Sequence, residues 1–419
     1  MKNLYHFSAA LTDGDASMVK LLGGKGANLA EMSRLGVKVP PGFTLTTETC
    51  RSYYRNKGTI SESLWQEICQ AVNSIGTQIG KNFGDAENPL LISVRSGAPC
   101  SMPGMMDSIL NLGLNCQTVE GLAKLSNNRR FAFDSYRRFL QMYAEIVLKV
   151  EASHFEDMLE ATKLGNGVKL DSELSADALE ELCHQYHRII KTITGKDFPE
   201  DVHAQLKQAI CAVYDSWMNE RAITYRQLHK ISADTGTAIN IQSMVFGNLG
   251  PESCTGVLFT RDPSSGENKL YGEYLANAQG EDVVAGTRTP LPIRTDQFAT
   301  YNPLALETTS PKIFKELSEV SRQLEAHYRD MQDIEFTVEQ GKLWILQTRT
   351  AKRSSSAAIK IAADLANENI ISRDEALMRL DANSLDRLLH PTIAPGEDYF
   401  ILDKGLPASP GAASGKVVF

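Results

Sequence analysis

Residues 331–349, MQDIEFTVEQGKLWILQTR, place the strongest constraint on the fold of this 419-residue chain. Polar and apolar side chains alternate in two runs, residues 333–338 and 343–349, and this pattern predicts the two arms of a β-hairpin. Successive side chains on a strand point to opposite faces. Each arm therefore presents two polar groups on one of its faces, and the four are Asp333, Glu335, Gln347 and Arg349.

The length of the turn, which Gly341 marks, decides whether these four polar groups meet. An odd loop, such as three residues with Gly341 in a left-handed conformation, brings all four to one side of the hairpin. A two-residue loop instead puts the carboxylates on the face of Trp344 and Leu346. The alternative is an ordinary solvated antiparallel hairpin, which alternating polar residues also indicate.

Composition indicates a globular protein with more than one domain. A chain of 419 residues is too long for one ordinary core, so two or three domains are expected. The net charge of −8 and the lack of a basic run argue against a nucleic-acid surface. No segment has the roughly 20 apolar residues of a membrane span, and the acidic, polar start is unlike a signal peptide. Seven scattered cysteines without a CxxC pair argue against zinc or a disulfide framework and fit a reducing cytoplasm.

Two early segments carry cations next to glycine-rich sequence. In residues 21–32, LLGGKGANLAEM, Lys25 lies on a glycine-rich loop before a helix expected to start near Ala27. Backbone amides and a lysine at a helix N-terminus suit an anion, although a tight turn before an amphipathic helix explains the pattern equally well. The GxxxxGK[ST] pattern of a P-loop is absent.

The second cation, Arg95, follows the apolar run 90–94, which reads as a buried strand. A guanidinium at a strand end can bind a phosphate through two hydrogen bonds at once. The loop that follows, residues 96–107, contains Ser101, Gly104 and a Met-Pro-Gly-Met-Met run. A loop with this many apolar residues could act as a lid that excludes water from a site. The alternative interpretation is a buried, methionine-rich loop that only packs against the core.

Residues 118–194 show helical spacing throughout and predict an all-helical insertion. His184 and His187 lie three apart on one of these helices, but no third metal ligand is near in sequence, so a solvated helix face is favoured. Residues 204–229 predict one further long helix. Strands are expected at 236–250, 256–260 and 269–274, and a glycine-bounded loop at 276–286 contains Glu281 and Asp282. A helix at 311–329 precedes the hairpin.

The predicted fold class is α+β: an ATP-grasp nucleotide-binding domain of two lobes with an all-helical insertion, then linker helices and the truncated start of a further domain. Two cations early in the chain and two carboxylates late, with glycine loops, suggest a nucleotide phosphotransferase of this arrangement. The predicted parts are a first lobe at 1–115, the insertion at 116–200, a return to the first lobe at 201–250, a second lobe at 251–350, linker helices at 351–395 and the start of the further domain at 396–419. Because the last part stops inside an apolar strand, we expect a truncated chain.

Six motifs of the chain resemble the pyruvate phosphate dikinases, which are phosphoenolpyruvate-utilising enzymes, over essentially the whole length. They are GGKGANLAEM, SVRSGAPCSMPGMMDSILNLG, NIQSMVFGN, ANAQGEDVVAGTRTP, MQDIEFTVEQGKLWILQTR and GLPASPGAASGKVV. The phosphoenolpyruvate synthases are less similar, because their counterpart of the SMPGMMD loop is more acidic. The synthase and a non-catalytic nucleotide-binding module are the alternative functions.

The resemblance implies a reaction of ATP, pyruvate and phosphate that gives AMP, phosphoenolpyruvate and diphosphate through a phosphohistidine. It implies that this histidine lies on a swivelling domain, of which residues 396–419 are the truncated start. It implies that ATP and Mg²⁺ bind in this part of the chain, whereas pyruvate binds only to a C-terminal barrel. By position, Lys25 and Arg95 match the phosphate-binding cations, and Arg95 and Arg349 are the catalytic candidates. Nucleotide contacts are implied at Ser101, Gly104, Met244, Glu281, Asp333, Glu335, Gln347 and Arg349, and metal ligands at Asp333, Glu335 and Gln347.

The chain departs from the family pattern at the phosphorylated histidine. The family's Thr-Ser-His motif, expected beyond the GLPASPG segment, is absent, and His390 lies before that segment in a different context. We therefore expect that these residues alone cannot complete the reaction, because the nucleophile of the covalent step is missing. The resemblance further implies a homodimer for the full-length enzyme, whereas a monomer is expected for this part. No nucleic acid or membrane partner is implied.

Overall fold

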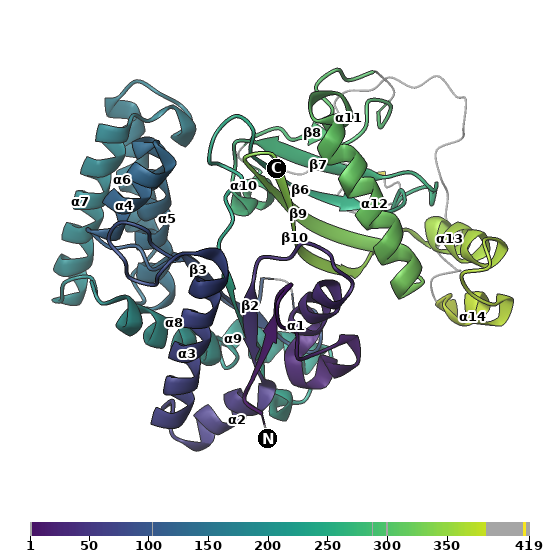
Figure 1. Ribbon diagram of the computed structural model, residues 1–419, viewed down its shortest axis with the longest axis horizontal. Coiled ribbons are helices and arrows are strands. Elements are labelled where there is room, and N and C mark those ends of the chain that lie inside the picture. The colour runs from purple at the N-terminus through teal and green to yellow at the C-terminus, as the bar shows by residue number, and fades with distance from the viewer. Residues whose placement is uncertain (1, 103, 287, 299–300, 383–413, 416–419) are drawn as a thin grey trace. The chain divides into compact units, whose positions relative to one another are not determined.

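The computed structural model describes residues 2–102, 104–286, 288–298, 301–382 and 414–415 (Figure 1). Helices and two antiparallel sheets make up these residues, so the α+β class is confirmed. The strands are β1 Leu4–Phe7, β2 Gly42–Leu45, β3 Ile92–Gly97, β4 Ser108–Leu112, β5 Ala238–Ser243, β6 Cys254–Phe259, β7 Tyr271–Ala276, β8 Leu291–Pro292, β9 Gln332–Glu339 and β10 Lys342–Thr350.

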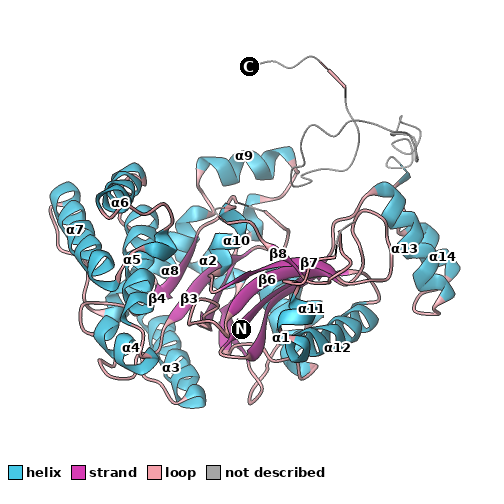
Figure 2. Cartoon of the chain, turned by 90° about the horizontal axis from the view of Figure 1, so that it is seen from above, coloured by secondary structure: helices cyan, strands magenta, loops and turns pink. Residues whose placement is uncertain are grey.

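The helices are α1 Val19–Arg34, α2 Thr47–Arg55, α3 Glu62–Ile79, α4 Thr118–Ser126, α5 Arg129–Ile146, α6 Ser153–Gly165, α7 Ala176–Thr194, α8 Val202–Ser216, α9 Glu220–Leu228, α10 Gly280–Ala285, α11 Leu306–Thr309, α12 Pro311–Tyr328, α13 Ser355–Asn367 and α14 Arg373–Met378. Figure 2 shows how they and the strands follow one another. No helix among the described residues is long and apolar enough to span a membrane.

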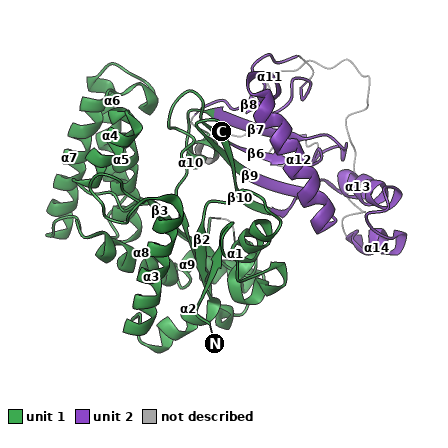
Figure 3. Ribbon diagram, viewed as in Figure 1, with its two compact units in different colours: residues 1–255, 276–287, 336–348 green, residues 256–275, 288–335, 349–419 purple. Residues whose placement is uncertain are grey.

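The described chain forms two compact units, coloured separately in Figure 3. The first contains residues 1–255, 276–287 and 336–348, and the second contains residues 256–275, 288–335 and 349–419. One five-stranded sheet has the order β1-β2-β5-β3-β4, and the other has the order β10-β9-β6-β7-β8. Strands β6, β7, β9 and β10 each have residues in both units.

The first sheet has one apolar and one polar face, because its register aligns residues of one kind across four strands. One row is fully apolar and belongs to the main core, and it consists of Phe43, Ile241, Val94 and Ile109. The next row points to the opposite face and is polar, and it consists of Thr44, Asn240, Arg95 and Ser108. A buried polar row costs free energy unless it is hydrogen-bonded, so this face is a candidate for function.

The helices predicted within residues 118–194 are present as α4 to α7. Helices α4 to α7 lie side by side in Figures 1 and 2, and α5 packs against both α4 and α7. Their buried aromatic rings extend the core of the first sheet; Phe155 and Tyr186, for example, stack edge to face at 4.9 Å between centroids.

Two of the predicted elements were wrong: the single long helix at residues 204–229 and the loop at residues 276–286. Residues 204–229 form two helices, α8 and α9, because the chain turns at residues 217–219 while the Trp217 indole is buried. Residues 276–286 hold the short helix α10, where a loop was expected, and its first turn carries Glu281 and Asp282. The Asp282 carboxylate accepts a hydrogen bond from the Gln279 backbone N–H at 2.9 Å at the start of this helix, which the glycines in the sequence obscured.

The other elements follow the sequence pattern closely. The predicted strands correspond to β5, β6 and β7, and the predicted helix at 311–329 corresponds to α12. The two expected linker helices are α13 and α14, and the Ser372 hydroxyl accepts a hydrogen bond from the Glu375 backbone N–H, as expected of a helix cap. The swivelling-domain start predicted for 396–419 lies outside the described residues, except for residues 414 and 415.

Candidate functional site

A break in helix α1 positions Lys25. The expected glycine loop is instead helical from Val19 to Arg34, except at Gly23, where φ is +69° and ψ is 167°. Only glycine adopts this conformation readily, and a Cβ at Gly23 would lie 1.7 Å from the Gly97 carbonyl oxygen. The Gly24 N–H donates to the Ala98 carbonyl at 3.1 Å. A new helix start therefore abuts the end of β3, one residue before Lys25.

Lys25 and Arg95 belong to the same face of the first sheet. A Cβ added to Gly26 would meet the Thr44 and Asn240 side chains at under 3 Å, so this turn of α1 lies directly on the polar row that contains Arg95. A Cβ on Gly97 would lie 3.7 Å from the Lys25 Cβ. The first unit thus brings together the two cations that the sequence placed seventy residues apart.

Two polar residues of β5 line the same face, and the sequence reasoning missed one of them, Asn240. Asn240 and Gln242 are buried on β5, and Asn240 accepts a hydrogen bond from the Thr44 hydroxyl at 2.8 Å. Within the described residues, the Asn240 Nδ2 atom is buried without a hydrogen-bond partner. An unsatisfied buried amide beside two cations is an expected feature of a ligand site. The sequence AINIQS alternates apolar and polar residues, so it already indicated a polar face at Asn240. We interpreted this alternation only as evidence for a strand.

The loop with Ser101 and Gly104 lies against helix α9. Met102 is buried in a small cluster with Trp217 and Ala222, and Tyr225 donates from its hydroxyl to the Ser101 carbonyl at 3.3 Å. The Asp107 carboxylate at the end of the loop forms an ion pair with Arg221. Gly104 has φ of +70° and open space around it. Both interpretations of this loop thus find support. Met102 is buried, as expected of a packing loop, whereas Ser101 and Gly104 are exposed, as expected of a lid over a ligand.

Glu281 is engaged by an arginine of the helical insertion. Its Oε1 atom lies 2.5 Å from Nη1 of Arg138, and Asp282 Oδ1 lies 2.8 Å from the same nitrogen. Arg138 also contacts the buried Asp134, and these carboxylates hold the pKa of the guanidinium well above its ordinary value against the effect of burial. The structure therefore gives Glu281 a firm role in joining α5 to α10. Met244, which was predicted to lie near adenine, follows β5, and its N–H donates to the Leu91 carbonyl at 2.9 Å.

The hairpin turn has two residues, so the odd loop that would bring all four polar groups to one side is absent. Strand β9 ends at Glu339 and β10 begins at Lys342, with φ of +47° at Gln340 and +73° at Gly341. Positive φ at both central residues is the pattern of a type I′ turn. Continued regularly, this register would place Asp333 on the face of Trp344 and Leu346, opposite to Arg349.

The base of the hairpin has a different register. There the Ala351 N–H donates to the Met331 carbonyl at 3.0 Å. From Lys342 to Ala351 the chain advances nine residues, whereas from Met331 to Glu339 it advances eight. Strand β10 therefore contains one extra residue, a β-bulge, which shifts its alternation by one position.

The shifted register pairs two of the four predicted hairpin residues. Arg349 Nε donates to Asp333 Oδ2 at 2.7 Å, and both residues belong to the second unit. Burial raises the pKa of the Asp333 carboxyl, and the Arg349 guanidinium partly opposes that rise. Glu335 is half-buried, two residues further along β9, and Gln347 is buried on β10. The joint placement of all four groups at a phosphate stays a prediction.

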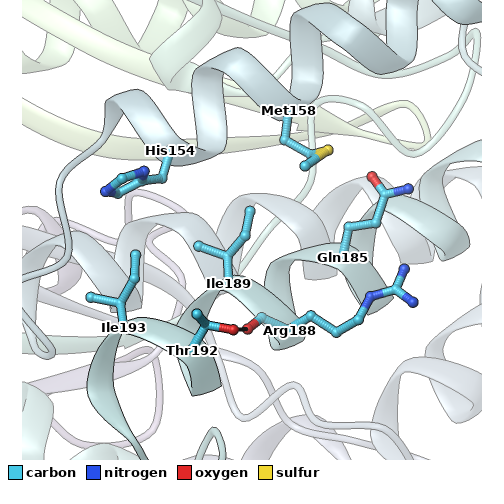
Figure 4. A pocket seen from close by; sticks show the side chains of 7 residues that line it. All are labelled: His154, Met158, Gln185, Arg188, Ile189, Thr192 and Ile193. Atoms are coloured by element: carbon cyan, nitrogen blue, oxygen red, sulfur yellow. Dashed lines mark hydrogen bonds between the residues drawn. The ribbon is translucent and has the colours of Figure 1, made fainter.

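A pocket on the helical insertion contains none of these residues (Figure 4). It opens between α6 and α7, and its lining consists of His154, Met158, Gln185, Arg188, Ile189, Thr192 and Ile193. Arg188 is exposed and pairs with Glu181, and no carboxylate belongs to the lining. The pocket therefore lacks the carboxylates that usually hold the magnesium of a nucleotide.

Comparisons with known proteins identify the family. Residues 19–62, 56–301 and 294–369 match the family described as "Pyruvate phosphate dikinase, AMP/ATP-binding domain". The chain is 52% identical to the pyruvate, phosphate dikinase of Clostridium symbiosum over 413 residues, 97% of this chain and 46% of that protein. Identity to the enzyme of Rhizobium meliloti is 52% over 420 residues, 100% of this chain and 47% of the relative.

A plant relative gives the same result. The chloroplastic pyruvate, phosphate dikinase of Mesembryanthemum crystallinum is 49% identical over 421 residues, 100% of this chain and 43% of that protein. The chain thus spans about half the length of the curated relatives it matches. On the family match and on these identities, the chain belongs to the pyruvate phosphate dikinase family.

Proposed function

We propose that this chain binds ATP with Mg²⁺ as the nucleotide-binding part of a pyruvate phosphate dikinase. The observation that carries the proposal is the match to the family's AMP/ATP-binding domain over residues 19–369, a span that includes every predicted nucleotide residue. An ATP-grasp domain is the proposed fold, with one lobe from residues 1–115 and 201–250 and the other from 251–350. The proximity of Lys25 and Arg95 in the first unit supports the assignment.

The two early cations would bind the phosphates. Arg95 lies on a strand within a sheet, so its guanidinium is held by rigid backbone and can offer two parallel hydrogen bonds to phosphate oxygens. Lys25 lies just after the break in α1, where a helix start adds further positive potential. The loop with Ser101 and Gly104 would cover the phosphates and exclude water. Met244 would lie on the adenine side.

Asp333, Glu335 and Gln347 would hold magnesium. Their donor atoms are carboxylate and amide oxygens, the hard ligands that Mg²⁺ prefers, so the residues present fit the ion. Asp333 is buried beside Arg349, which keeps one carboxylate oxygen oriented. Bound there, magnesium supplies positive charge that neutralises the nucleotide phosphates. Arg349 would stabilise negative charge that develops on the transferred phosphoryl group.

The complete reaction is proposed from the relatives. They are named pyruvate, phosphate dikinases, and the chain spans about half their length. The family resemblance places the phosphoryl acceptor in a Thr-Ser-His motif that these 419 residues do not contain. The proposal therefore assigns the nucleotide step to this chain, and it assigns the pyruvate step to a barrel of the full-length enzyme.

Nucleotide binding can be tested on the chain itself. Mg-ATP is expected to raise its melting temperature and to give a saturable isotherm by calorimetry. Arg95→Ala and Glu335→Ala are each expected to abolish both effects, because each removes a charge that contacts the phosphates or their metal. Arg322→Ala, on the exposed face of α12, is the control and should bind like the parent. A folded parent chain, verified by circular dichroism, that shows neither effect would refute the proposal.

A further inference from the structure

Three side chains with metal-binding atoms meet at one end of the helical insertion, all within the first unit. Cys116 precedes α4, His187 lies in α7, and Glu200 precedes α8. Their ligand atoms lie within 4.8 Å of one another, the only such group of three or more in the part of the chain that the structure describes. The sequence pattern favoured a solvated helix for the histidines. His184 is indeed exposed, whereas His187 is half-buried.

The distances fit a tetrahedral zinc ion. The Cys116 sulfur lies 3.4 Å from Glu200 Oε1 and 4.0 Å from His187 Nε2. With Zn–S of about 2.3 Å and Zn–N or Zn–O of about 2.0 Å, the edges between ligands are about 3.5 Å long. Thiolate, imidazole and carboxylate are all ligands that zinc uses, and a soft sulfur disfavours magnesium or calcium.

Hydrogen bonds around the cluster hold the three segments in place before any metal binds. The Cys116 N–H donates to Glu200 Oε2 at 3.1 Å, and the Asn115 side-chain amide donates to the Glu200 carbonyl at 2.9 Å. The fully buried Gln205 donates to the carbonyls of Leu114 and Pro199 at 3.0 and 2.8 Å. This outer shell orients Glu200 toward the sulfur, as surrounding residues do in known metal sites.

Two aromatic residues hold the imidazole of His187 in place. The ring stacks edge to face on Phe198 at 5.5 Å between centroids. The Tyr136 hydroxyl lies 2.7 Å from Nε2 and 3.7 Å from the Cys116 sulfur. When a metal binds Nε2, the Tyr136 hydroxyl can donate its hydrogen bond to the Cys116 thiolate instead.

We propose that Cys116, His187 and Glu200 form a zinc site in this protein, separate from the nucleotide residues. Binding converts the Cys116 thiol to a thiolate, and its proton leaves to solvent. Three protein ligands leave a fourth position for water. The site connects the segment before α4, helix α7 and the segment before α8, so zinc would fasten the insertion to the chain that returns to the first sheet.

The test uses Zn²⁺ and Co²⁺ with the metal-free 419-residue chain. We expect about one zinc per chain to remain after dialysis, a rise in melting temperature with Zn²⁺ but not with Mg²⁺, and a thiolate-to-cobalt charge-transfer band with tetrahedral visible bands for Co²⁺. Cys116→Ser should remove the charge-transfer band and weaken zinc binding about tenfold or more. Glu200→Gln should also weaken binding while keeping that band.

The matched control is Cys69→Ser, because the Cys69 sulfur also lies near a histidine, 3.9 Å from His203 Nδ1. This variant should retain the cobalt spectrum and the zinc affinity. Circular dichroism of the metal-free proteins separates loss of a ligand from loss of the fold. A folded parent that keeps no zinc, or a Cys116→Ser variant that binds zinc as tightly as the parent, would overturn the proposal. Neither result depends on ATP binding.

Discussion

Arg349 and Asp333 form a direct ion pair at the base of the β9–β10 hairpin, with 2.7 Å between Nε and Oδ2. The pairing exists because a bulge in β10 shifts the register by one residue between tip and base. It joins a buried carboxylate to a half-exposed guanidinium. In the proposed nucleotide site, Arg349 would therefore have two tasks: to contact phosphate, and to lower the pKa of Asp333 against the effect of burial.

The first prediction concerns that second task. Burial raises the pKa of Asp333 and Arg349 lowers it, so Arg349→Met should raise this pKa further. A protonated carboxyl cannot bind magnesium, so Mg-ATP affinity should fall more steeply from about pH 8 to about pH 5.5 in the variant than in the parent. At about pH 8 the variant should still bind about tenfold more weakly, because a phosphate contact is lost.

Calorimetric titration of both proteins with Mg-ATP across this pH range provides the measurement. Arg322→Ala, an exposed arginine of the same unit, should reproduce the pH profile of the parent. Parallel profiles for Arg349→Met and the parent would show that Arg349 does not govern the ionisation of Asp333.

The hairpin also shows how far the sequence could be interpreted. Alternation correctly predicted both arms and the turn, because period-two patterning follows directly from strand geometry. The expected odd loop was wrong, since Gln340 takes a left-handed conformation that favours glycine or asparagine. The bulge left no mark in the sequence pattern. The number of residues in the loop was therefore predicted wrongly, although Asp333 and Arg349 do contact each other through the bulge.

Contacts between distant segments lay beyond sequence reasoning altogether. Glu281 was predicted as a nucleotide contact from its motif, but its ion pair with Arg138 depends on how α10 packs beside α5. Likewise, His187 seemed to lack metal-binding neighbours because Cys116 and Glu200 come from other parts of the chain. Such pairings are decided by tertiary packing, which local propensity and spacing do not encode.

The second prediction follows from the turn. Gln340→Asn should stabilise the chain by about 0.5–1 kcal/mol, because asparagine tolerates the left-handed conformation that glutamine adopts here at a cost. The midpoint of urea unfolding should rise accordingly. Gln78→Asn is the control: this exposed glutamine lies in helix α3, where asparagine is the poorer helix former. A stabilisation of equal size at both positions would contradict the turn argument.

The third prediction concerns Asp134, which is buried between Arg137 at 2.8 Å and Arg138 at 3.2 Å. Burial alone would raise the pKa of Asp134, but the two guanidinium groups outweigh it and leave the pKa well below its usual range. Asp134→Asn leaves two cations without their shared carboxylate and should cost about 3–5 kcal/mol of unfolding free energy at neutral pH.

The pH dependence of this loss has a definite sign. A carboxyl whose pKa is lower in the folded state stabilises the fold above its unfolded pKa of about 4, and this stability is lost as pH falls toward the folded pKa. The difference between parent and Asp134→Asn should therefore shrink below about pH 4. Denaturation curves at several pH values measure it. Asp157→Asn, an exposed position on α6, should change stability by less than about 0.5 kcal/mol throughout. A difference for Asp134 that grows in acid would contradict the assignment.

The last prediction addresses the loop that carries Ser101 and Gly104. Its end is held by Asp107, which pairs with Arg221 of α9, while Met102 packs on Trp217. Arg221→Ala should release the end of the loop and speed hydrogen–deuterium exchange in residues 98–107. Because Arg221 is exposed, the whole chain should lose less than about 1 kcal/mol of stability.

Exchange measured by mass spectrometry on peptides from this loop distinguishes local release from global loosening. Arg188→Ala removes another exposed ion pair, that with Glu181 on α7, and should leave the exchange of the loop unchanged. If both variants accelerate exchange in residues 98–107 equally, the Asp107–Arg221 pair is not what holds the loop. If only Arg221→Ala does so, the Asp107–Arg221 pair restrains the end of the loop, and a phosphate ligand that prefers another loop position could replace this exposed contact.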